Sequence, residues 1–225
     1  MKRPRRPQRA AQTAQRRDSA RSAARRPQFG WTAAAAIFAV ALAVRLVHVW
    51  QIRRAPFFSV LMGDARAYDE WAQQIARGDW LGHEVFYQAP LYPYFLGTLY
   101  AIAGHDLLVV RLCQAIIGSL ACLLLGLAGW RLFSRRAGVI AGLGLALYAP
   151  AIFFDALLQK SVLDVFLVCL AIWLLSGLVA EPQTRGSWTV IEGIRARDWF
   201  WLGLVMGGLS LTRENALIFS GVTLL

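Results

Sequence analysis

Charged residues, cysteine and histidine are all scarce in this sequence. Only 16% of the 225 residues are charged, whereas 57% are hydrophobic, a balance far from that of an average soluble domain. The three cysteines (Cys113, Cys122 and Cys169) lie in apolar runs, where a free cysteine behaves as a small hydrophobic residue. Neither they nor the three scattered histidines have the spacing of metal ligands. The scarcity of charge excludes an ordinary soluble domain and indicates an integral membrane protein.

The net charge of +11 is concentrated in the first 30 residues, which hold ten Lys or Arg against Asp18 alone. Residues 1–28 contain no large aliphatic or aromatic residue after Met1. This tail therefore cannot bury enough apolar surface to fold, and we expect it to be disordered. A basic tail can bind RNA or anionic lipid, or it can hold the amino terminus in the cytoplasm. We favour the topological role and expect no nucleic-acid partner.

Long apolar runs make up most of the remaining chain, residues 29–225. Five of them approach the length of a membrane span, roughly 20 residues, and they cover residues 31–50, 107–130, 138–154, 162–179 and 199–219. No small-residue cleavage site follows the first run, so we expect it to be retained rather than removed as a signal peptide. A sixth run begins near residue 216, and we expect the sequence to be the amino-terminal part of a longer membrane protein. The predicted fold class is an all-α integral membrane protein, a polytopic helical bundle.

The basic residues at the ends of these runs indicate the orientation of the chain. With the amino terminus in the cytoplasm, the inner segments hold sixteen Lys or Arg and the outer segments hold five. Cytoplasmic loops of membrane proteins carry the excess of positive charge. We therefore expect a multi-pass protein of the inner (plasma) membrane, with a cytoplasmic amino terminus and an extracytoplasmic loop over residues 51–106.

The loop of residues 51–106 is too long to be a simple connection, and loops of this length usually carry function. Between residues 65 and 76, small and apolar residues recur at spacings of three and four, which predicts an amphipathic helix lying on the membrane. Asp64 stands where a carboxylate would cap this helix, and Gly78 stands where a glycine would end it. A second segment, residues 90–103, is too short to span and is expected at the interface. Together the two segments predict a structured, helix-containing outer loop.

Four ionisable residues are expected at the outer face of the membrane at similar depth: Asp64, Asp155, Lys160 and Arg213. Ionisable groups within spans cost roughly 2.5 to 3.5 kcal/mol each at a helix centre and are functional candidates by default. At about 1.5 Å per residue, Asp155 lies about 25 Å along the third run and Arg213 about 21 Å along the fifth. The convergence of three separate parts of the chain favours a site at this face.

Each of these residues also has a purely structural interpretation. Asp64 can serve as a helix cap, and Asp155 and Lys160 can be ordinary polar residues of a hairpin. Arg213 can belong to a helix break in which it pairs with Glu214. These alternatives stay open at the level of the sequence.

Other ionisable residues lie within or beside the apolar runs. Arg45 and His48 precede the outer end of the first run by about one turn, and we expect them to extend to the interface rather than take part in chemistry. Asp164 lies near the start of the fourth run, and the sequence assigns it no role.

A series of short motifs resembles a known family of membrane enzymes. The motifs are Gly63-Asp64 with Tyr68 four residues after the Asp, Pro90-Leu91-Tyr92-Pro93, Arg111-Leu112, Arg131-Leu132-Phe133, Asp155 and Leu211-Thr212-Arg213. From about residue 31 onward, this pattern resembles the polytopic glycosyltransferases of the GT-C fold. Within them it is most similar to the protein-mannosyltransferase and aminoarabinose-transferase-like group of family 39. The resemblance implies a GT-C-like fold.

The resemblance also implies an activity. Such a transferase takes a sugar from a polyprenyl-phosphate donor and passes it to a lipid, glycan or protein acceptor at the extracytoplasmic face. The Asp of the first outer loop is then the catalytic carboxylate, which in this chain is Asp64. Many relatives have Glu directly after this Asp, where this chain has Ala65. The reaction requires no cofactor besides the lipid-linked donor, and we expect no metal site.

The residues at the outer face suit this chemistry independently of the resemblance. Displacement of a phosphate from a sugar by an acceptor hydroxyl needs a general base, a role that Asp64 can fill. The departing lipid phosphate needs cationic stabilisation, for which we expect Arg213 first and Lys160 second.

Three further residues are candidates for substrate binding. Asp155 can orient the acceptor or hold one of the two cations in place. Tyr68 and Tyr92 can line the sugar pocket, although aromatic residues near a membrane surface often serve only as anchors.

A different class of protein would use the same residues in another way. In a membrane transporter or lipid flippase, Asp64, Asp155 and Arg213 would form a substrate pathway or a proton relay. Transporters often show inverted repeats, and no repeat is visible between the two halves of this sequence. An inactive scaffold is a third interpretation, and the transferase is the one we favour.

Overall fold

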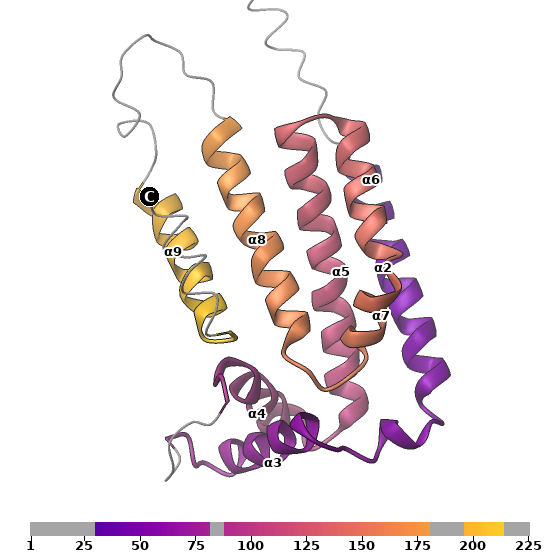
Figure 1. Ribbon diagram of the computed structural model, residues 1–225, viewed down its shortest axis with the longest axis vertical. Helices are drawn as coiled ribbons and strands as arrows, with labels where there is room; N and C mark the ends of the chain where they lie inside the picture. The colour runs from indigo at the N-terminus through magenta and orange to yellow at the C-terminus, as the bar shows by residue number, and fades with distance from the viewer. Residues whose placement is uncertain (1–29, 82–87, 181–195, 214–225) are drawn as a thin grey trace, which may run out of the picture. The chain divides into compact units, whose positions relative to one another are not determined.

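The computed structural model describes residues 30–81, 88–180 and 196–213, and this part of the chain is helical apart from its connections (Figure 1). The predicted all-α class is confirmed. The basic tail of residues 1–28 and the sixth apolar run lie outside the described residues. In chain order the elements are α2 (Trp31–Ile52), the 3₁₀ helix η1 (Pro56–Phe58), α3 (Asp64–Ala76), α4 (Leu91–Ala103), α5 (Leu107–Leu132), α6 (Arg135–Ala146), α7 (Ala149–Asp155), α8 (Ser161–Ala180) and α9 (Ala196–Ser210).

The helices α2, α5 and α8 are each long and apolar enough to cross a membrane. They correspond to the first, second and fourth predicted runs. The third run, predicted as one span over residues 138–154, is divided instead into α6 and α7, which are bent by 53° relative to each other. The break follows from Pro150 in the first turn of α7. Proline has no N–H to donate, and in a continuous helix its ring would clash with the carbonyl four residues earlier.

The fifth predicted run, residues 199–219, appears in the described part of the chain as α9, which ends at Ser210. A tight turn follows, in which the Thr212 hydroxyl donates to the Leu209 carbonyl at 2.7 Å. In the same turn, the carbonyl of Leu211 accepts from the N–H of Leu91 at 3.2 Å. The end of α9 is therefore joined to the beginning of α4, although the two lie far apart in the sequence.

The helix α5 packs against α2, α6 and α8. Its contact with α6 is made through glycines on both helices. A Cβ atom placed on Gly138 would meet the carbonyl oxygen of Gly126 and would come within 2.8 Å of the Trp130 backbone nitrogen. Small residues at a contact let two helix backbones approach closely, which is the usual means of helix packing inside a membrane.

Large apolar side chains remain exposed along the outside of these helices. They include Trp31 and Val47 on α2, Ile140 on α6, Val179 on α8 and Phe200 and Leu204 on α9. An exposed apolar surface of this extent marks an interaction surface in a soluble protein. Here the spanning lengths of the helices identify the missing neighbour as lipid.

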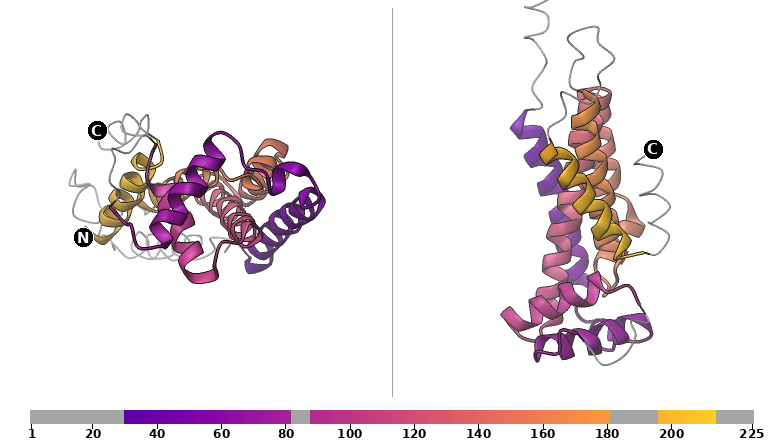
Figure 2. Two further views of the ribbon diagram at one scale, coloured as in Figure 1. Left: turned by 90° about the horizontal axis from the view of Figure 1, so that it is seen from below. Right: turned by 90° about the vertical axis from the view of Figure 1, so that its left-hand side faces the viewer.

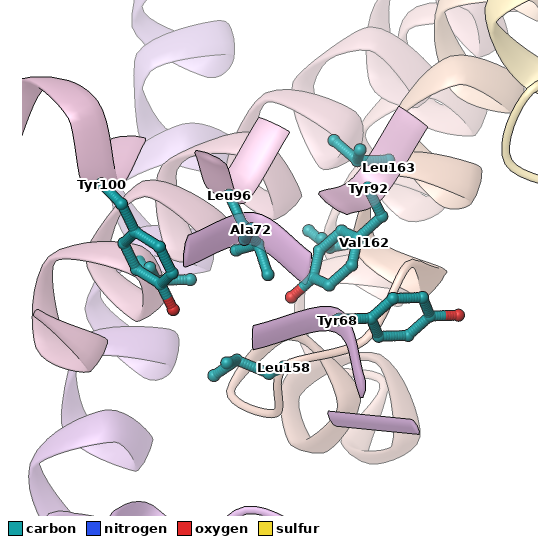
Figure 3. Close-up of a cluster of buried hydrophobic side chains, with 9 residues drawn as sticks. Tyr68, Ala72, Tyr92, Leu96, Tyr100, Leu158, Val162 and Leu163 are labelled. Atoms are coloured by element: carbon teal, nitrogen blue, oxygen red, sulfur yellow. The ribbon is translucent and has the colours of Figure 1, made fainter. Parts of the chain in front are cut away.

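The helices α3 and α4 lie across one end of the spanning helices, where α2 ends and where α5 and α8 begin (Figures 1 and 2). We call this the α3–α4 end. A cluster of buried side chains, drawn in Figure 3, joins the two helices to α5, α8 and the connection before α8. Its members are Tyr68, Ala72, Tyr92, Leu96, Tyr100, Val110, Leu158, Val162 and Leu163. The predicted structured loop is thus packed on the spanning helices.

The helix predicted between residues 65 and 76 is confirmed as α3, but its apolar face is buried against other helices rather than laid on the membrane as predicted. Its apolar face packs on α4, and the contact is close because α4 has a glycine there: a Cβ atom on Gly97 would lie 2.7 Å from the Ile75 Cγ2. Gly78 follows the helix with a φ of 106°, a conformation that favours glycine. The predicted ending of the helix at this glycine is therefore confirmed.

Candidate functional site

The four predicted outer-face residues all lie toward the α3–α4 end. Asp64 is the first residue of α3, and Asp155 is the last residue of α7. Lys160 directly precedes α8, and Arg213 follows the turn that ends α9. Their individual environments differ, and these differences decide which of them can meet a ligand.

Asp64 is exposed, and its side chain does not cap α3. The N-cap residue is Gly63, whose φ of 57° and ψ of −132° lie in a region that glycine tolerates, and no side chain caps the helix end. The capping role predicted for Asp64 was therefore wrong. Its Oδ1 instead accepts a hydrogen bond of 3.0 Å from the Gln88 side-chain amide. An exposed carboxylate at the start of α3 can be reached by a ligand.

Arg213 forms an ion pair with Asp164 of α8, through its Nε and the Asp164 Oδ2. The Arg213 side chain is 57% exposed, whereas that of Asp164 is 11% exposed. Glu214, the partner considered in the sequence, lies outside the described residues. The buried carboxylate thus holds the guanidinium by one edge and leaves most of its surface open.

Tyr68 connects Asp64 with this ion pair. Its pKa is raised from the ordinary value, first by burial and then by the negative charges of Asp64 and Asp164, while the positive charge of Arg213 acts in the opposite direction. The charges of these three side chains thus act on the same phenol. Like an ordinary tyrosine, Tyr68 is therefore protonated at neutral pH, and its hydroxyl can donate a hydrogen bond. Asp64, Tyr68, Asp164 and Arg213 therefore form one group, which we call the α3–α8 site.

Tyr92 is fully buried behind Tyr68. The two rings meet edge to face, with their centroids 5.1 Å apart, and both are drawn in Figure 3. The Tyr92 hydroxyl donates to the Gln114 Oε1 at 2.6 Å. The structure thus places Tyr92 in the core, where it supports Tyr68, rather than on a surface that a sugar could contact.

Asp155 forms a buried ion pair with Arg45 of α2. The Arg45 Nε lies 2.8 Å from the Asp155 Oδ2, and the two side chains are 2% and 7% exposed. The prediction that Arg45 extends to the interface was therefore wrong. Gly118 of α5 leaves room for the pair, because a Cβ atom there would meet the Asp155 carboxylate and would lie 2.7 Å from the Arg45 Nε. The cation that Asp155 holds is Arg45, and not Arg213 or Lys160.

Arg111 of α5 is a buried residue that the sequence analysis included in a motif without assigning it a role. Its guanidinium donates to the carbonyls of Leu107 at 3.1 Å, Phe58 at 2.8 Å and Ala156 at 2.9 Å. It also lies over the Phe58 ring, 3.8 Å from its centroid. An arginine within an apolar run is itself a signal of function or of a buried network. Arg111 ties α5 to η1 and to the connection between α7 and α8.

Gln114, one turn further along α5, continues this network. Its amide nitrogen donates to the carbonyls of Asp155 at 2.8 Å and Leu157 at 2.6 Å. Together with Arg111, it binds the carbonyls of three successive residues, 155 to 157. This connection is therefore held firmly, and it leads directly to Lys160, which is half-buried at the start of α8.

Asp69 of α3 belongs to a second polar group that the sequence did not reveal. The spacing of small and apolar residues along α3 leaves Asp69 outside the apolar face, yet Asp69 is only 7% exposed. It accepts hydrogen bonds from the Tyr100 hydroxyl at 2.6 Å and from the Gln73 amide at 2.8 Å, and His105 lies 2.8 Å away. Burial, followed by the bond to Asp69, raises the Tyr100 pKa. These hydrogen bonds join α3 to α4 and so help to hold α3, the helix that begins with Asp64.

The sequence of the chain identifies its family. The sequence model of the dolichyl-phosphate-mannose-protein mannosyltransferase family matches residues 87–224, more than half of the chain. The chain belongs to this family. Its members are membrane glycosyltransferases of the GT-C type that use a polyprenyl-phosphate-linked sugar as donor, which confirms the resemblance seen in the motifs. No curated protein and no solved structure matches the chain significantly.

The family match divides the α3–α8 site into two parts. Asp164 and Arg213 fall within the matched region, as does the neighbouring Lys160, whereas Asp64 and Tyr68 precede it. Among the described residues, no three His, Cys, Asp or Glu side chains come together as metal ligands would. The α3–α8 site itself combines the exposed Arg213 held by a buried carboxylate, the Tyr68 phenol and the exposed Asp64 carboxylate.

Proposed function

We propose that this mannosyltransferase-family protein transfers a sugar from a polyprenyl-phosphate donor to an acceptor hydroxyl at the α3–α8 site. The observation that carries the proposal is that the exposed Asp64, at the start of α3, and the exposed Arg213, held by Asp164 of α8, lie at the same end of the spans and both act electrostatically on Tyr68. The site thus combines the exposed cation of Arg213, which can bind a phosphate, with the exposed carboxylate of Asp64, which can accept a proton. Family membership supports the same class of donor.

In the proposed reaction, the acceptor oxygen attacks the anomeric carbon of the sugar and gives its proton to Asp64. The bond from that carbon to the phosphate oxygen breaks, and its electron pair leaves with the lipid phosphate. Arg213 stabilises the negative charge on the departing phosphate, because a guanidinium offers several donors in a fixed plane. Lys160, at the start of α8, adds a second positive charge. The Tyr68 hydroxyl is available to donate a hydrogen bond to the substrate.

The roles of the supporting residues follow from their burial. Arg111 and Gln114 hold the connection before Lys160, and the pair of Arg45 and Asp155 fixes the end of α7. Buried groups of this kind position a site without touching the substrate, and catalysis depends on such positioning. We therefore assign Asp155 to the framework of the site.

The α3–α4 end is proposed to face the extracytoplasmic side of the plasma membrane. The excess of basic residues at the opposite ends of the spans supports this orientation. The acceptor is then a lipid, glycan or protein exposed on that side. The family match weighs against the alternative of a transporter or lipid flippase.

The experiment that tests the proposal is transfer of radiolabelled sugar from membrane-extracted polyprenyl-phosphate donors by the full-length protein. Asp64→Asn removes the proton acceptor and should lower turnover by a factor of about 10² to 10⁴, since that is the usual contribution of a general base. Arg213→Ala removes a charged hydrogen-bond donor and should weaken donor binding by about 10- to 100-fold. Binding of the donor by Asp64→Asn should remain close to that of the wild type.

The matched controls are Glu70→Gln on α3 and Arg66→Ala beside it. These two residues form an exposed pair on the same helix, 2.6 Å apart, and exposed pairs contribute little to stability. Both variants should transfer sugar as the wild type does. Full activity of Asp64→Asn would reject Asp64 as the base, and equal loss of donor binding in both site variants would contradict the division of roles.

A further inference from the structure

Two polar groups at the beginning of α8 are buried without a hydrogen-bond partner. They are the Asp164 Oδ1 and the Ser161 hydroxyl, for which the described part of the chain offers no donor or acceptor. Asp164 as a whole is only 8% exposed. A buried polar atom without a partner is destabilising, and most such atoms in folded proteins are bonded to protein, water or ligand. Water or a ligand can supply the missing hydrogen bonds of these two groups.

The two groups lie on the same side of α8. Ser161 and Asp164 are three residues apart in the first turn of the helix, a spacing that places side chains next to each other on the helix surface. The other oxygen of the Asp164 carboxylate holds Arg213. The unpartnered oxygen is consequently next to the group to which we have assigned the donor phosphate.

The chemistry of the two groups defines what they can bind. An ionised carboxylate oxygen can only accept a hydrogen bond, whereas a serine hydroxyl can both donate and accept. A single hydroxyl group satisfies both, because it donates to Asp164 and accepts from Ser161. A second anion would be repelled by the carboxylate, and a cation would be repelled by Arg213.

We propose that Ser161 and Asp164 form a subsite that binds a hydroxyl group of the donor sugar beside its phosphate. The subsite rests on the proposed function, because Arg213 and Lys160 must hold the phosphate of the same molecule. Asp164 then has two roles at once: one oxygen positions Arg213, and the other recognises the sugar. The subsite distinguishes a lipid phosphate that carries a sugar from one that has lost it.

The test compares two kinds of ligand on the full-length protein in lipid nanodiscs. The first is farnesyl phosphate, and the second is the farnesyl phosphate ester of mannose, glucose or galactose, each measured by equilibrium binding. The quantity of interest is the gain in affinity that the sugar brings. We expect the wild type to bind at least one of the esters more tightly than farnesyl phosphate.

Ser161→Ala is the main variant, since Ser161 does not hold Arg213. It should lower the affinity for the preferred ester by about two- to tenfold, as expected for one hydrogen bond, and leave the affinity for farnesyl phosphate unchanged. Asp164→Asn keeps an oxygen for Arg213 but presents an amide N–H₂ in place of the second acceptor. It should lower the affinity for the ester by about tenfold or more, since a hydrogen bond to a charged group is lost.

Two matched controls change a serine of α8 and an aspartate of α9 that lie outside the proposed subsite. Ser176→Ala changes a buried serine at the other end of α8, whose hydroxyl donates to the Trp173 carbonyl at 2.7 Å. Asp198→Asn changes a carboxylate on α9 that lies 3.6 Å from Arg197. Both should retain the affinity gain that the sugar brings. Thermal unfolding of all four variants identifies any loss of binding that comes from misfolding.

Each outcome has a distinct meaning. A sugar-dependent gain that Ser161→Ala and Asp164→Asn remove, and that the controls retain, supports the subsite. A gain that survives in Ser161→Ala and Asp164→Asn overturns it. Binding of farnesyl phosphate by the wild type with no gain from any of the three sugars also overturns the subsite, while leaving the phosphate site intact. Binding of neither ligand would instead reject the proposed donor class, and the subsite with it.

Discussion

Removal of the buried Asp155 carboxylate should destabilise the protein far more than removal of the exposed Glu70 carboxylate, although both form short ion pairs with an arginine. In Asp155→Ala, Arg45 stays 2% exposed within α2 and loses its partner. An uncompensated charge in a protein interior destabilises by about 3 to 5 kcal/mol. The reference is Glu70→Ala, which breaks the pair with Arg66 at 2.6 Å, where the side chains are 70% and 56% exposed. A pair as exposed as this one contributes little to stability, because water and salt screen it.

The assay is reversible unfolding in detergent micelles, carried out as two double-mutant cycles. In the first, Arg45→Met is combined with Asp155→Leu, which removes both charges. Replacing a buried ion pair by apolar side chains is often neutral or stabilising, so the double variant should recover most of the stability lost by either single variant. The second cycle, on Arg66 and Glu70, should show little coupling.

The same double variant separates a structural role of Asp155 from a role in substrate binding. If Asp155 serves only to hold α7, then Arg45→Met with Asp155→Leu should transfer sugar at a rate near that of the wild type once its stability is restored. A coupling energy for the buried pair no larger than that of the exposed pair would refute the reasoning about burial. A stable but inactive double variant would return Asp155 to the list of substrate-binding residues.

Two further predictions concern the framework of the site. Arg111→Gln should destabilise the protein by about 2 to 5 kcal/mol, since it leaves the carbonyls of Phe58 and Ala156 without their charged donor. The measurement is thermal unfolding, with Arg53→Gln, which changes an exposed arginine, as the control. Equal melting temperatures of the two variants would contradict the prediction. Gly138→Val should separate α5 from α6, since even a Cβ atom meets the Gly126 carbonyl there. A loss of about 1 to 3 kcal/mol is expected for such overpacking, whereas Gly144→Val, at a position with open space, should unfold as the wild type does.

The long spans could be predicted from the sequence because each depends on its own composition. The helices α2, α5 and α8 follow apolar runs whose length alone indicates a crossing. The division of the third run into α6 and α7 was missed, although Pro150 was a visible signal of it. Hydropathy records how apolar a segment is, but it does not record where its backbone must bend.

The site could be predicted only in part, since its pairings join distant parts of the chain. The sequence placed Arg213 and Lys160 correctly near the same end of the spans. It could not show that Arg213 would pair with Asp164, 49 residues earlier, or that Arg45 would pair with Asp155. Such pairs depend on which faces of the helices meet, and that is decided by packing between helices rather than by any one run.

The separation of Arg45 from Asp155 has a consequence for how the protein is made. The two residues are 110 positions apart, and at ordinary rates of synthesis, about 5 to 20 residues per second, the partner of Arg45 is made roughly 5 to 20 seconds later. During this interval α2 must reside at the membrane with an unpaired charge near its second end. A long side chain so placed can extend to the headgroup region. We therefore expect the Arg45 side chain to lie in the headgroup region while the chain is being made, and to take its buried place beside Asp155 only once α7 has been made.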